Sequence, residues 1–395
     1  MQPHVMNVYG VPSPVIQRGQ GMHLYDDQGE AWLDFHAGIG VNALGAAHPH
    51  LVDALQRQSA LLWHCSNLHM IPGQERLAAR LCALSFADQV FFCNSGVEAL
   101  EGMIKMARRF HAIKGDSRRW RIMTVTGAFH GRSLATLAAG KNPKHLAGFG
   151  PQVDGFDQCP LANMNALRQM ITDETAALLV EPIQGESGVH VLDRDYLQAL
   201  RQTADEFGLL LLFDEVQCGN GRTGRYFAHQ WAGIEPDLLA TAKGLGGGFP
   251  IGAILARQTI ADAMHVGSHG STFGGNPLAM AVSNAVLDIV ADREFLSRIV
   301  LMGTRLESGL DQLVAHWPAI YCSRRGQGLM QGLVCNKPSN LDMIKALRDH
   351  RILVAPAGGN VIRLLPPLIV EDTHIDQVLH ALDEIARCLE GNGSS

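Results

Sequence analysis

Apolar runs of strand length alternate with longer amphipathic stretches through the middle of the chain. The stretches at 97–111 and 196–207 have the apolar spacing of helices and separate several of these runs. Strands that alternate with helices in this way are typical of an α/β protein with a doubly wound, mainly parallel sheet. In such sheets, ligands bind at the carboxyl ends of the strands. The predicted strands are 89–93, 121–126, 176–181, 209–214 and 238–241.

The two ends of the chain have a different pattern. Residues 15–45 combine short apolar segments with turn signals rich in Gly and Asp, which predicts a small antiparallel sheet. Helices are expected from near His50, from Pro72 and from Pro277, and residues 301–389 mix helices with short strands. We therefore expect an N-terminal segment at 1–50, a large domain at 51–283 and a smaller α+β domain at 284–395.

The composition is that of an ordinary globular protein. The chain has 395 residues, 47% of them hydrophobic and 18% charged, and its net charge of -6 mixes both signs, so nothing in it indicates nucleic acid or an anionic membrane. It contains no apolar run long enough to cross a bilayer, and its first residues lack the features of a signal peptide. The 8 cysteines form no C-x-x-C and the 18 histidines no H-E-x-x-H, so we expect reduced thiols in the cytoplasm and no metal.

One lysine ends an apolar run and is followed at once by glycines. Lys243 comes directly after the predicted strand 238–241 and precedes Gly244. A lysine that attacks a carbonyl group must be neutral, so its pKa has to fall through burial or a nearby cation. Glycines let a flat molecule approach the backbone closely. Taken alone, however, the stretch fits a surface lysine before a Gly-rich turn.

Two other predicted strands end in carboxylates. Asp214 lies on the same strand face as Val216, and a carboxylate in this position can keep a ring nitrogen protonated, which turns a pyridine ring into an electron sink. Glu181 and Glu186 enclose a Pro and a Gly, which suits a shaped active-site loop. Solvated acids at strand ends are the alternative for both stretches.

Two stretches have the composition of a phosphate site. Ser95 and Gly96 lie where a helix opens after a strand, and backbone amides at a helix start bind anions. Ser95 and Glu98 also form the sequence of a capping box, which needs no ligand, and both interpretations can hold together. The stretch 268–277 is rich in glycine and hydroxyl groups, as expected at a phosphate or in a flexible loop.

An aromatic residue and two arginines complete the candidates. Phe129 could stack on a planar ring, and Arg132 could bind a carboxylate through two parallel hydrogen bonds. A core phenylalanine and a surface arginine are the alternative. Arg363 lies within an apolar strand, and a buried arginine must find an anion, either a structural one or that of a substrate.

Taken together, these stretches resemble the class III family of fold-type I pyridoxal-phosphate aminotransferases, from Val15 to Leu368. The resemblance implies pyridoxal 5'-phosphate as the cofactor, a seven-stranded sheet flanked by helices, and a homodimer with shared active sites. It implies that Lys243 binds the cofactor covalently and acts as general acid and base, while Asp214 pairs with the ring nitrogen. The other cofactor contacts that it implies are Ser95, Gly96 and Val97 at the phosphate, Phe129 and Val216 on the ring faces, Gln217 at the ring hydroxyl, and Thr272 of the partner subunit.

Within that family, the chain is most similar to members that transfer the distal amino group of N-acetylornithine to 2-oxoglutarate in arginine biosynthesis. The resemblance implies that Arg132 binds the α-carboxylate of the first substrate and Arg363 that of the second. Glu186 would cover Arg363 and move away when the dicarboxylate binds. Ser271 is implied as a further substrate contact. Ile39 stands where ornithine-specific members carry a tyrosine, which favours an acylated substrate.

Several alternatives stay open. N-succinyl-diaminopimelate, ornithine or another ω-amino acid could be the amino donor, and an aminomutase or a non-catalytic regulatory protein of the same fold is a more distant possibility. Gly219, Gly221 and Gly224 formally match the dinucleotide fingerprint, but no clean apolar helix follows them, so an oxidoreductase is weakly supported. Ala46 replaces the histidine that is usual in the family.

Overall fold

The structure of the protein is a computed structural model that describes residues 4–10 and 13–392. Its largest layer is a sheet of seven strands, in which one strand runs antiparallel to all the others. The prediction of a mainly parallel sheet is therefore confirmed. In order across the sheet the strands are β4 (Gln89–Cys93), the antiparallel β12 (Gly252–Ala256), β11 (Leu238–Thr241), β10 (Leu210–Asp214), β7 (Thr175–Val180), β5 (Arg121–Val125) and β6 (Phe156–Cys159).

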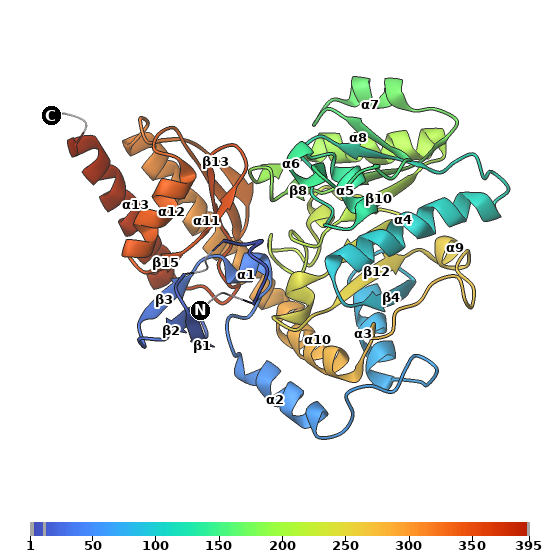
Figure 1. The fold of residues 1–395 in the computed structure, drawn as a ribbon, viewed down its shortest axis with the longest axis horizontal. Helices are drawn as coiled ribbons and strands as arrows, with labels where there is room; N and C mark the ends of the chain where they lie inside the picture. Colours follow the sequence, from blue (N-terminus) through green and yellow to red (C-terminus); the bar gives the residue numbers. More distant parts are fainter. Residues whose placement is uncertain (1–3, 11–12, 393–395) are drawn as a thin grey trace.

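Helices cover both faces of this sheet, because its strands are apolar on both sides. Leu212 of β10 packs in the same cluster as Met103, whereas its neighbour Phe213 packs with Leu200. Met103 belongs to α4 and Leu200 to α8, so these two helices lie on opposite faces (Figure 1). The helices of this part are α2 (Pro49–Ser59), α3 (Pro72–Ala83), α4 (Gly96–Ile113), α5 (Leu134–Gly140), α6 (Pro143–Leu146), α7 (Met164–Met170), α8 (Arg194–Phe207), α9 (Gln258–Ala261) and α10 (Pro277–Val290).

A smaller α+β part contains both ends of the described chain (Figure 1). The predicted antiparallel sheet forms from β1 to β3, and a strand from the C-terminal region extends it by pairing with β3. The predicted domain boundaries stay a prediction, and position 283 lies inside α10. This part consists of β1 (Ile16–Gln20), β2 (His23–Asp26), β3 (Ala31–Asp34), α1 (Ala37–Gly40), α11 (Arg293–His316), β13 (Tyr321–Gln327), β14 (Met330–Cys335), α12 (Asn340–Asp349), β15 (Ile352–Leu353), β16 (Ala355–Ala357), β17 (Val361–Leu364) and α13 (Asp372–Asn392).

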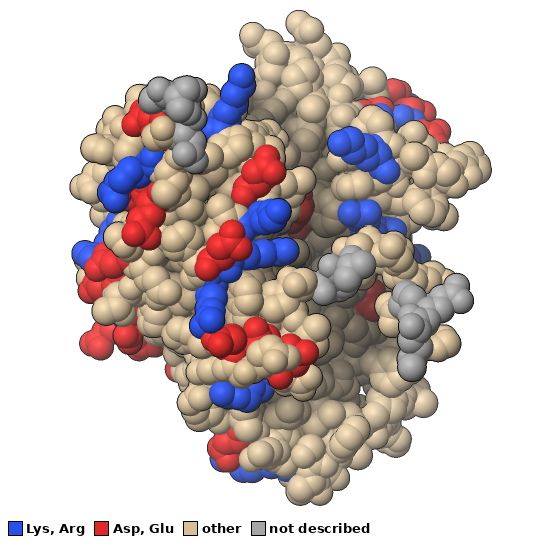
Figure 2. Space-filling model, turned by 60° about the vertical axis from the view of Figure 1, so that its left-hand side comes forward, with Lys and Arg blue, Asp and Glu red and all other residues tan. Residues whose placement is uncertain are grey.

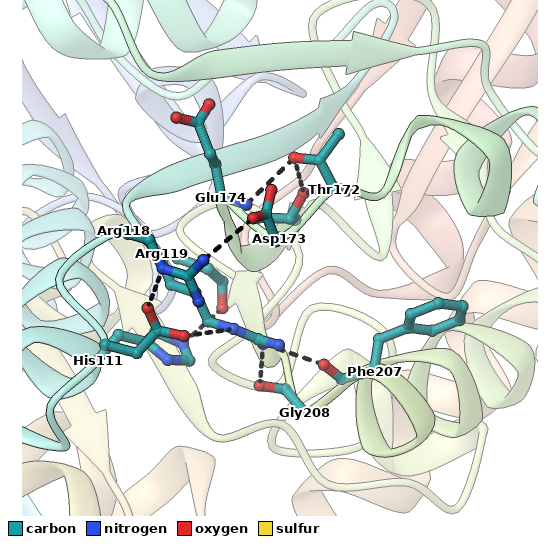
Figure 3. A network of polar contacts seen from close by, with 11 residues as sticks. His111, Arg118, Arg119, Thr172, Asp173, Glu174, Phe207 and Gly208 are labelled. Atoms are coloured by element: carbon teal, nitrogen blue, oxygen red, sulfur yellow. Dashed lines mark hydrogen bonds and ion pairs between the residues drawn. The ribbon is translucent and has the colours of Figure 1, made fainter.

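Polar side chains tie the elements together at the edge where the parallel strands begin (Figure 3). Arg119 donates from Nη1 to the carbonyl oxygens of Phe207 and Gly208, at 3.0 and 2.9 Å, and so satisfies the end of α8. Nε2 of His111, near the end of α4, lies 2.9 Å from the carbonyl oxygen of Ala176 in β7. These contacts stabilise the edge of the sheet that lies opposite the carboxyl ends of the parallel strands.

The stretch that matches the dinucleotide fingerprint forms turns and does not open a helix. Gly221 and Gly224 have φ angles of 83° and 87°, in the left-handed region that favours glycine. Added Cβ atoms would collide with Val290 and Val300, on α10 and α11. The glycines therefore allow close packing of the two parts of the protein, which explains them without a nucleotide.

Several general features of the described residues bear on function. None of their helices is long and apolar enough to cross a membrane, and none of their His, Cys, Asp and Glu side chains form a group of three or more that could hold a metal ion. All 8 cysteines are free thiols. Figure 2 shows basic and acidic side chains interspersed on the face that it presents, as the mixed charge pattern predicted.

Candidate active site

A cavity of about 420 Å³ opens at the carboxyl edge of the large sheet. Its walls include the residues at or just after the ends of β7, β10 and β11, where the sequence pattern predicted the reactive side chains. Its volume lies in the range of about 300–1,000 Å³ that is usual for small-molecule sites. The predicted site residues that line it are Ser95, Gly96, Val97, Phe129, Arg132, Glu186, Asp214, Val216, Gln217 and Lys243.

Lys243 follows β11 and begins the short 3-10 turn η2 (Lys243–Gly246). Its φ of 45° lies in the left-handed region, which is strained for a residue other than glycine. Burial lowers the pKa of Lys243; Glu186 opposes this shift and Arg363 adds to it. Among the described residues, the amine makes no hydrogen bond or ion pair. The side chain is therefore poised to be a neutral nucleophile and base.

Asp214 is held by a contact to each of its carboxylate oxygens. Nδ1 of His130 lies 2.8 Å from Oδ2, and the backbone N–H of Val216 donates to Oδ1 at 3.1 Å. Asp214 and His130 are both buried, and Nε2 of His130 has no partner in the described part of the chain. His130 was not among the residues predicted from the sequence. Its position between Phe129 and Arg132, which are both predicted site residues, was the signal that could have identified it.

Glu181 is a second buried acid beside Asp214. Val180 pairs with Phe213 across β7 and β10, so the two carboxyl groups follow neighbouring strand positions. The backbone N–H of Phe129 donates to Oε1 of Glu181 at 2.8 Å. Burial raises the pKa of Glu181 well above its ordinary value, and the nearby Asp214 raises it further. Both effects favour the neutral form of Glu181, which also lines the cavity.

The N-terminus of α4 forms another wall of the cavity. Ser95 caps the helix, because its Oγ accepts a hydrogen bond from the backbone N–H of Glu98 at 3.3 Å. A Cβ on Gly96 would lie 2.8 Å from Cγ1 of Val216, so the close approach of these two segments requires glycine. The backbone N–H groups of Gly96 and Val97 have no acceptor among the described residues. The cap and an anion site can thus exist together.

Arg363 lies in β17, behind the cavity, and is 1% exposed. Its Nη1 donates to Oε1 of Glu186 at 2.5 Å and to Oε1 of Gln217 at 3.1 Å. Nε2 of Gln217 also donates to Glu186, at 3.2 Å. Although burial opposes the shift, the charge of Arg363 lowers the pKa of Glu186. The anion that this buried arginine requires is therefore supplied here by the carboxylate of Glu186.

Besides Arg363, which lies behind the cavity, three predicted site residues do not line the cavity of their own chain. Thr272 is exposed. Ser271 accepts a hydrogen bond from Nδ2 of Asn94 at 3.2 Å, next to the start of α4. Ile39 is 43% exposed and lies in α1, where all residues of Ala37–Gly40 have positive φ angles. The roles of these three residues stay predictions.

The comparisons with known proteins add the family. The family model Aminotransferase class-III matches residues 6–386. The chain belongs to the class-III aminotransferases. One curated member, the acetylornithine aminotransferase of Mesorhizobium japonicum, is 54% identical over 367 residues, which cover 93% of this chain and 92% of that relative.

Solved structures agree with this family and with the fold. The N-acetylornithine aminotransferase of Stenotrophomonas maltophilia is 33% identical with a TM-score of 0.84, and the match covers 98% of this class-III chain and 99% of that one. An ornithine aminotransferase of Toxoplasma gondii is 29% identical with a TM-score of 0.93, over 98% and 93% of the two chains. The description of that structure places pyridoxal phosphate at its active site.

Class-III aminotransferases depend on pyridoxal phosphate, and the cavity has the groups that this cofactor needs. The unpaired N–H groups at the start of α4 suit its phosphate, because a helix N-terminus attracts anions. The carboxylate of Asp214 suits a protonated ring nitrogen, and the unpaired amine of Lys243 suits an aldehyde. The residues present therefore fit the cofactor of the family.

Proposed function

We propose that this protein transfers the distal amino group of N-acetylornithine to 2-oxoglutarate, which gives N-acetylglutamate 5-semialdehyde and glutamate, a step of arginine biosynthesis. The observation that carries the proposal is the 54% identity, over 93% of the chain, to a relative named acetylornithine aminotransferase. A cavity lined by Lys243, Asp214 and Arg132 supports it, since a transaminase needs a base, an anchor for the cofactor ring and a carboxylate receptor.

Bound pyridoxal phosphate supplies an electron sink, which stabilises negative charge on the carbon that carries the amino group. Asp214, oriented by His130, would keep the ring nitrogen protonated. Lys243, whose pKa is lowered by burial, would use Nζ to take the proton from the amine-bearing carbon of the substrate. The remaining cofactor contacts that we assign are Ser95, Gly96, Val97, Phe129, Val216 and Gln217 of the same chain and Thr272 of the partner subunit.

One cavity must accept a substrate with an α-carboxylate far from the reacting amine and another with two carboxylates. We assign the carboxylate of N-acetylornithine to Arg132. The carboxylate of Glu186 neutralises Arg363 while this substrate is bound, because an unpaired buried guanidinium would be costly. For 2-oxoglutarate, Glu186 would move away so that Arg363 can bind the α-carboxylate and Arg132 the distal one.

Ornithine is the alternative substrate that needs the sharpest test, since an ornithine aminotransferase has nearly the same fold. Ile39 offers an apolar side chain where a tyrosine hydroxyl would contact an unblocked amino acid. We therefore expect kcat/KM for N-acetylornithine to exceed that for ornithine by about a hundredfold, as is usual when a polar group meets an unsuited pocket. Equal values would contradict the assignment of the substrate.

A single spectroscopic experiment tests the cofactor and both halves of the reaction. The purified protein should absorb visible light through its bound cofactor. N-acetylornithine alone should bleach this band, and 2-oxoglutarate should restore it. A Lys243→Ala variant should lose turnover by several orders of magnitude, as happens when a nucleophile and base are removed together. Bleaching without recovery on addition of 2-oxoglutarate would exclude the proposed amino acceptor.

We also propose that the protein is a homodimer in the cytoplasm. Exposed Thr272 lies away from the cavity of its own chain, so its hydroxyl is available to a second copy. Large apolar side chains are exposed nearby, on residues 61–70 and on Phe273. Apolar patches of this kind mark protein interfaces. The free thiols are in keeping with a reducing compartment.

A further inference from the structure

His145 lies at the mouth of the cavity and has had no role so far. It belongs to the short helix α6 and is half-buried. Its Nε2 lies 3.3 Å from Nη2 of Arg132. Its ring meets the ring of Phe129 edge to face, with the centroids 5.9 Å apart. The guanidinium of Arg132 in turn lies 5.6 Å from the centroid of Phe129, so the three side chains form one cluster.

The chemistry of this cluster determines the state of the imidazole. A guanidinium group only donates hydrogen bonds, so Nε2 of His145 has to be the acceptor and the proton has to be on Nδ1. Burial lowers the pKa of His145, and the charge of Arg132 lowers it further, which keeps the ring neutral near pH 7. The contact between His145 and Arg132 therefore exists only with a neutral imidazole.

Arg132 has no carboxylate partner in the described part of the chain, so its charge is available to a ligand. The side chain is also exposed, and a free arginine has many rotamers that binding must restrict. Two contacts restrict it beforehand, one with the face of Phe129 and the other with Nε2 of His145. Such orientation before binding lowers the entropic cost of holding a carboxylate.

We propose that His145 is a positioning residue that orients the guanidinium of Arg132 for the substrate carboxylate. This inference rests on the proposed function, in which Arg132 binds a carboxylate of each substrate. Because both half-reactions use Arg132, loss of its contact with His145 must weaken the binding of both substrates. Loss of the Arg363 contact would weaken the binding of the dicarboxylate alone, so the two kinds of defect can be distinguished.

The test compares two replacements of His145. His145→Phe keeps an aromatic ring beside Phe129 but removes the acceptor, and KM for both substrates should rise about tenfold while kcat changes by less than about twofold. His145→Gln restores an acceptor of similar reach, and both KM values should return to within about threefold of the original. Calorimetric titration with glutarate, a dicarboxylate that cannot react, should show the highest affinity for the original protein, a slightly lower one for His145→Gln and the lowest for His145→Phe.

Control variants separate the possible failures. Lys144→Ala changes the exposed neighbour of His145 on α6 and should leave both KM values unchanged. Unchanged KM values in His145→Phe, or equal losses in the Phe and Gln variants, would overturn the positioning role. Arg132→Ala should raise both KM values by more than either change at His145. If Arg132→Ala leaves them unaltered, the proposed function of the site fails instead.

A pH profile gives a readout that a purely structural role would not affect. Protonation of His145 would direct an N–H group at the guanidinium of Arg132 and break the contact. Because burial and Arg132 lower the pKa of His145 below the ordinary value of 6.5, the ratio of kcat/KM for the original protein to that for His145→Gln should fall only at pH values below 6.5. The charged groups that face the ring are Arg132 and Glu186, while α5, which packs on α6, has none. A ratio that stays constant from pH 8 down to the lowest pH at which both proteins remain folded would overturn the proposal.

Discussion

At the scale of single residues, the cavity brings together ionisable groups from the ends of three neighbouring strands. Lys243 follows β11, Asp214 ends β10 and Glu181 follows β7. Asp214 contacts Nδ1 of His130 and the backbone N–H of Val216, whereas Glu181 accepts one backbone hydrogen bond. Burial and the nearby Asp214 raise the pKa of Glu181, since two adjacent buried charges of like sign repel. Strand-end positions were predictable from the sequence, but this pKa shift depends on burial and was not.

The raised pKa of Glu181 leads to a prediction about pH. A carboxyl group whose pKa is raised by folding takes up a proton when the chain folds, so stability falls as the pH rises above the ordinary value of 4.5. Glu181→Gln removes this dependence of stability on pH. Relative to that of the original protein, the free energy of unfolding of the variant should increase by up to about 1.4 kcal/mol per pH unit above 4.5. Denaturant titrations from pH 5 to 8 measure this, and parallel pH profiles would show that Glu181 is ionised.

The left-handed turn of α1 leads to a second prediction. Ile39 has a φ of 64°, and a left-handed residue other than glycine costs roughly 1–2 kcal/mol. Ile39→Gly should therefore stabilise the protein by up to about 1 kcal/mol, after the larger entropy of glycine in the unfolded chain is subtracted. Ile39→Ala is the matched control, because it removes the same exposed side chain but keeps the strain. If thermal or denaturant unfolding finds the two variants equally stable, strain is not stored at this position.

At the scale of elements, apolar runs bounded by turns predicted β4, β5, β7, β10 and β11. The sequence analysis missed β6, in which two of the four residues are the polar Asp157 and Gln158. It also missed β12, which is apolar but follows a Gly-rich stretch and pairs antiparallel with both neighbours. Its place between β4 and β11 depends on contacts far apart in the sequence, and local pattern does not contain that information.

Helix α8 gives a prediction at this scale, because its last carbonyl groups depend on one side chain from another element (Figure 3). Arg119→Ala would leave the carbonyl oxygens of Phe207 and Gly208 without their donor. We expect a loss of about 1–2 kcal/mol in the free energy of unfolding, as for other hydrogen bonds with a charged donor. Because this edge of the sheet lies opposite the cavity, kcat and KM should not change.

The neighbouring arginine is the control for that experiment. Arg118 pairs with Asp116 and Asp173, but its side chain is 69% exposed. Exposed ion pairs contribute little, so Arg118→Ala should cost less than about 0.5 kcal/mol. Similar losses in the two variants, measured by denaturant unfolding, would show that net charge matters here and the capping of α8 does not.

At the scale of the whole molecule, the active site draws on both the large and the small part of the protein. Arg363 comes from the small sheet and reaches Glu186 and Gln217 of the large part. Nearby, the fully buried Arg222 donates to the carbonyl oxygens of Leu329 and Pro366, which ties the two parts together. Burial lowers the pKa of Arg222 to about 10. The sequence marked Arg363 as a buried cation, but only the fold shows which carboxylate neutralises it.

The last prediction concerns a second copy of the chain. Met70 is 97% exposed, and residues 61–70 lie against the loop of Thr272, since the rings of His64 and Phe273 contact each other at a tilt, with centroids 5.4 Å apart. Met70→Asp would bury an unpaired charge in the proposed interface, at a cost of at least about 2 kcal/mol or roughly a thirtyfold weaker dimer. Sedimentation should show monomers at concentrations where the original protein is dimeric, and bound cofactor should be lost with the partner's Thr272. Leu341→Asp, at an equally apolar exposed site on α12, should leave both unchanged, because α12 belongs to the small part. If Met70→Asp stays dimeric and keeps its cofactor, the interface lies elsewhere and Thr272 has no part in the site.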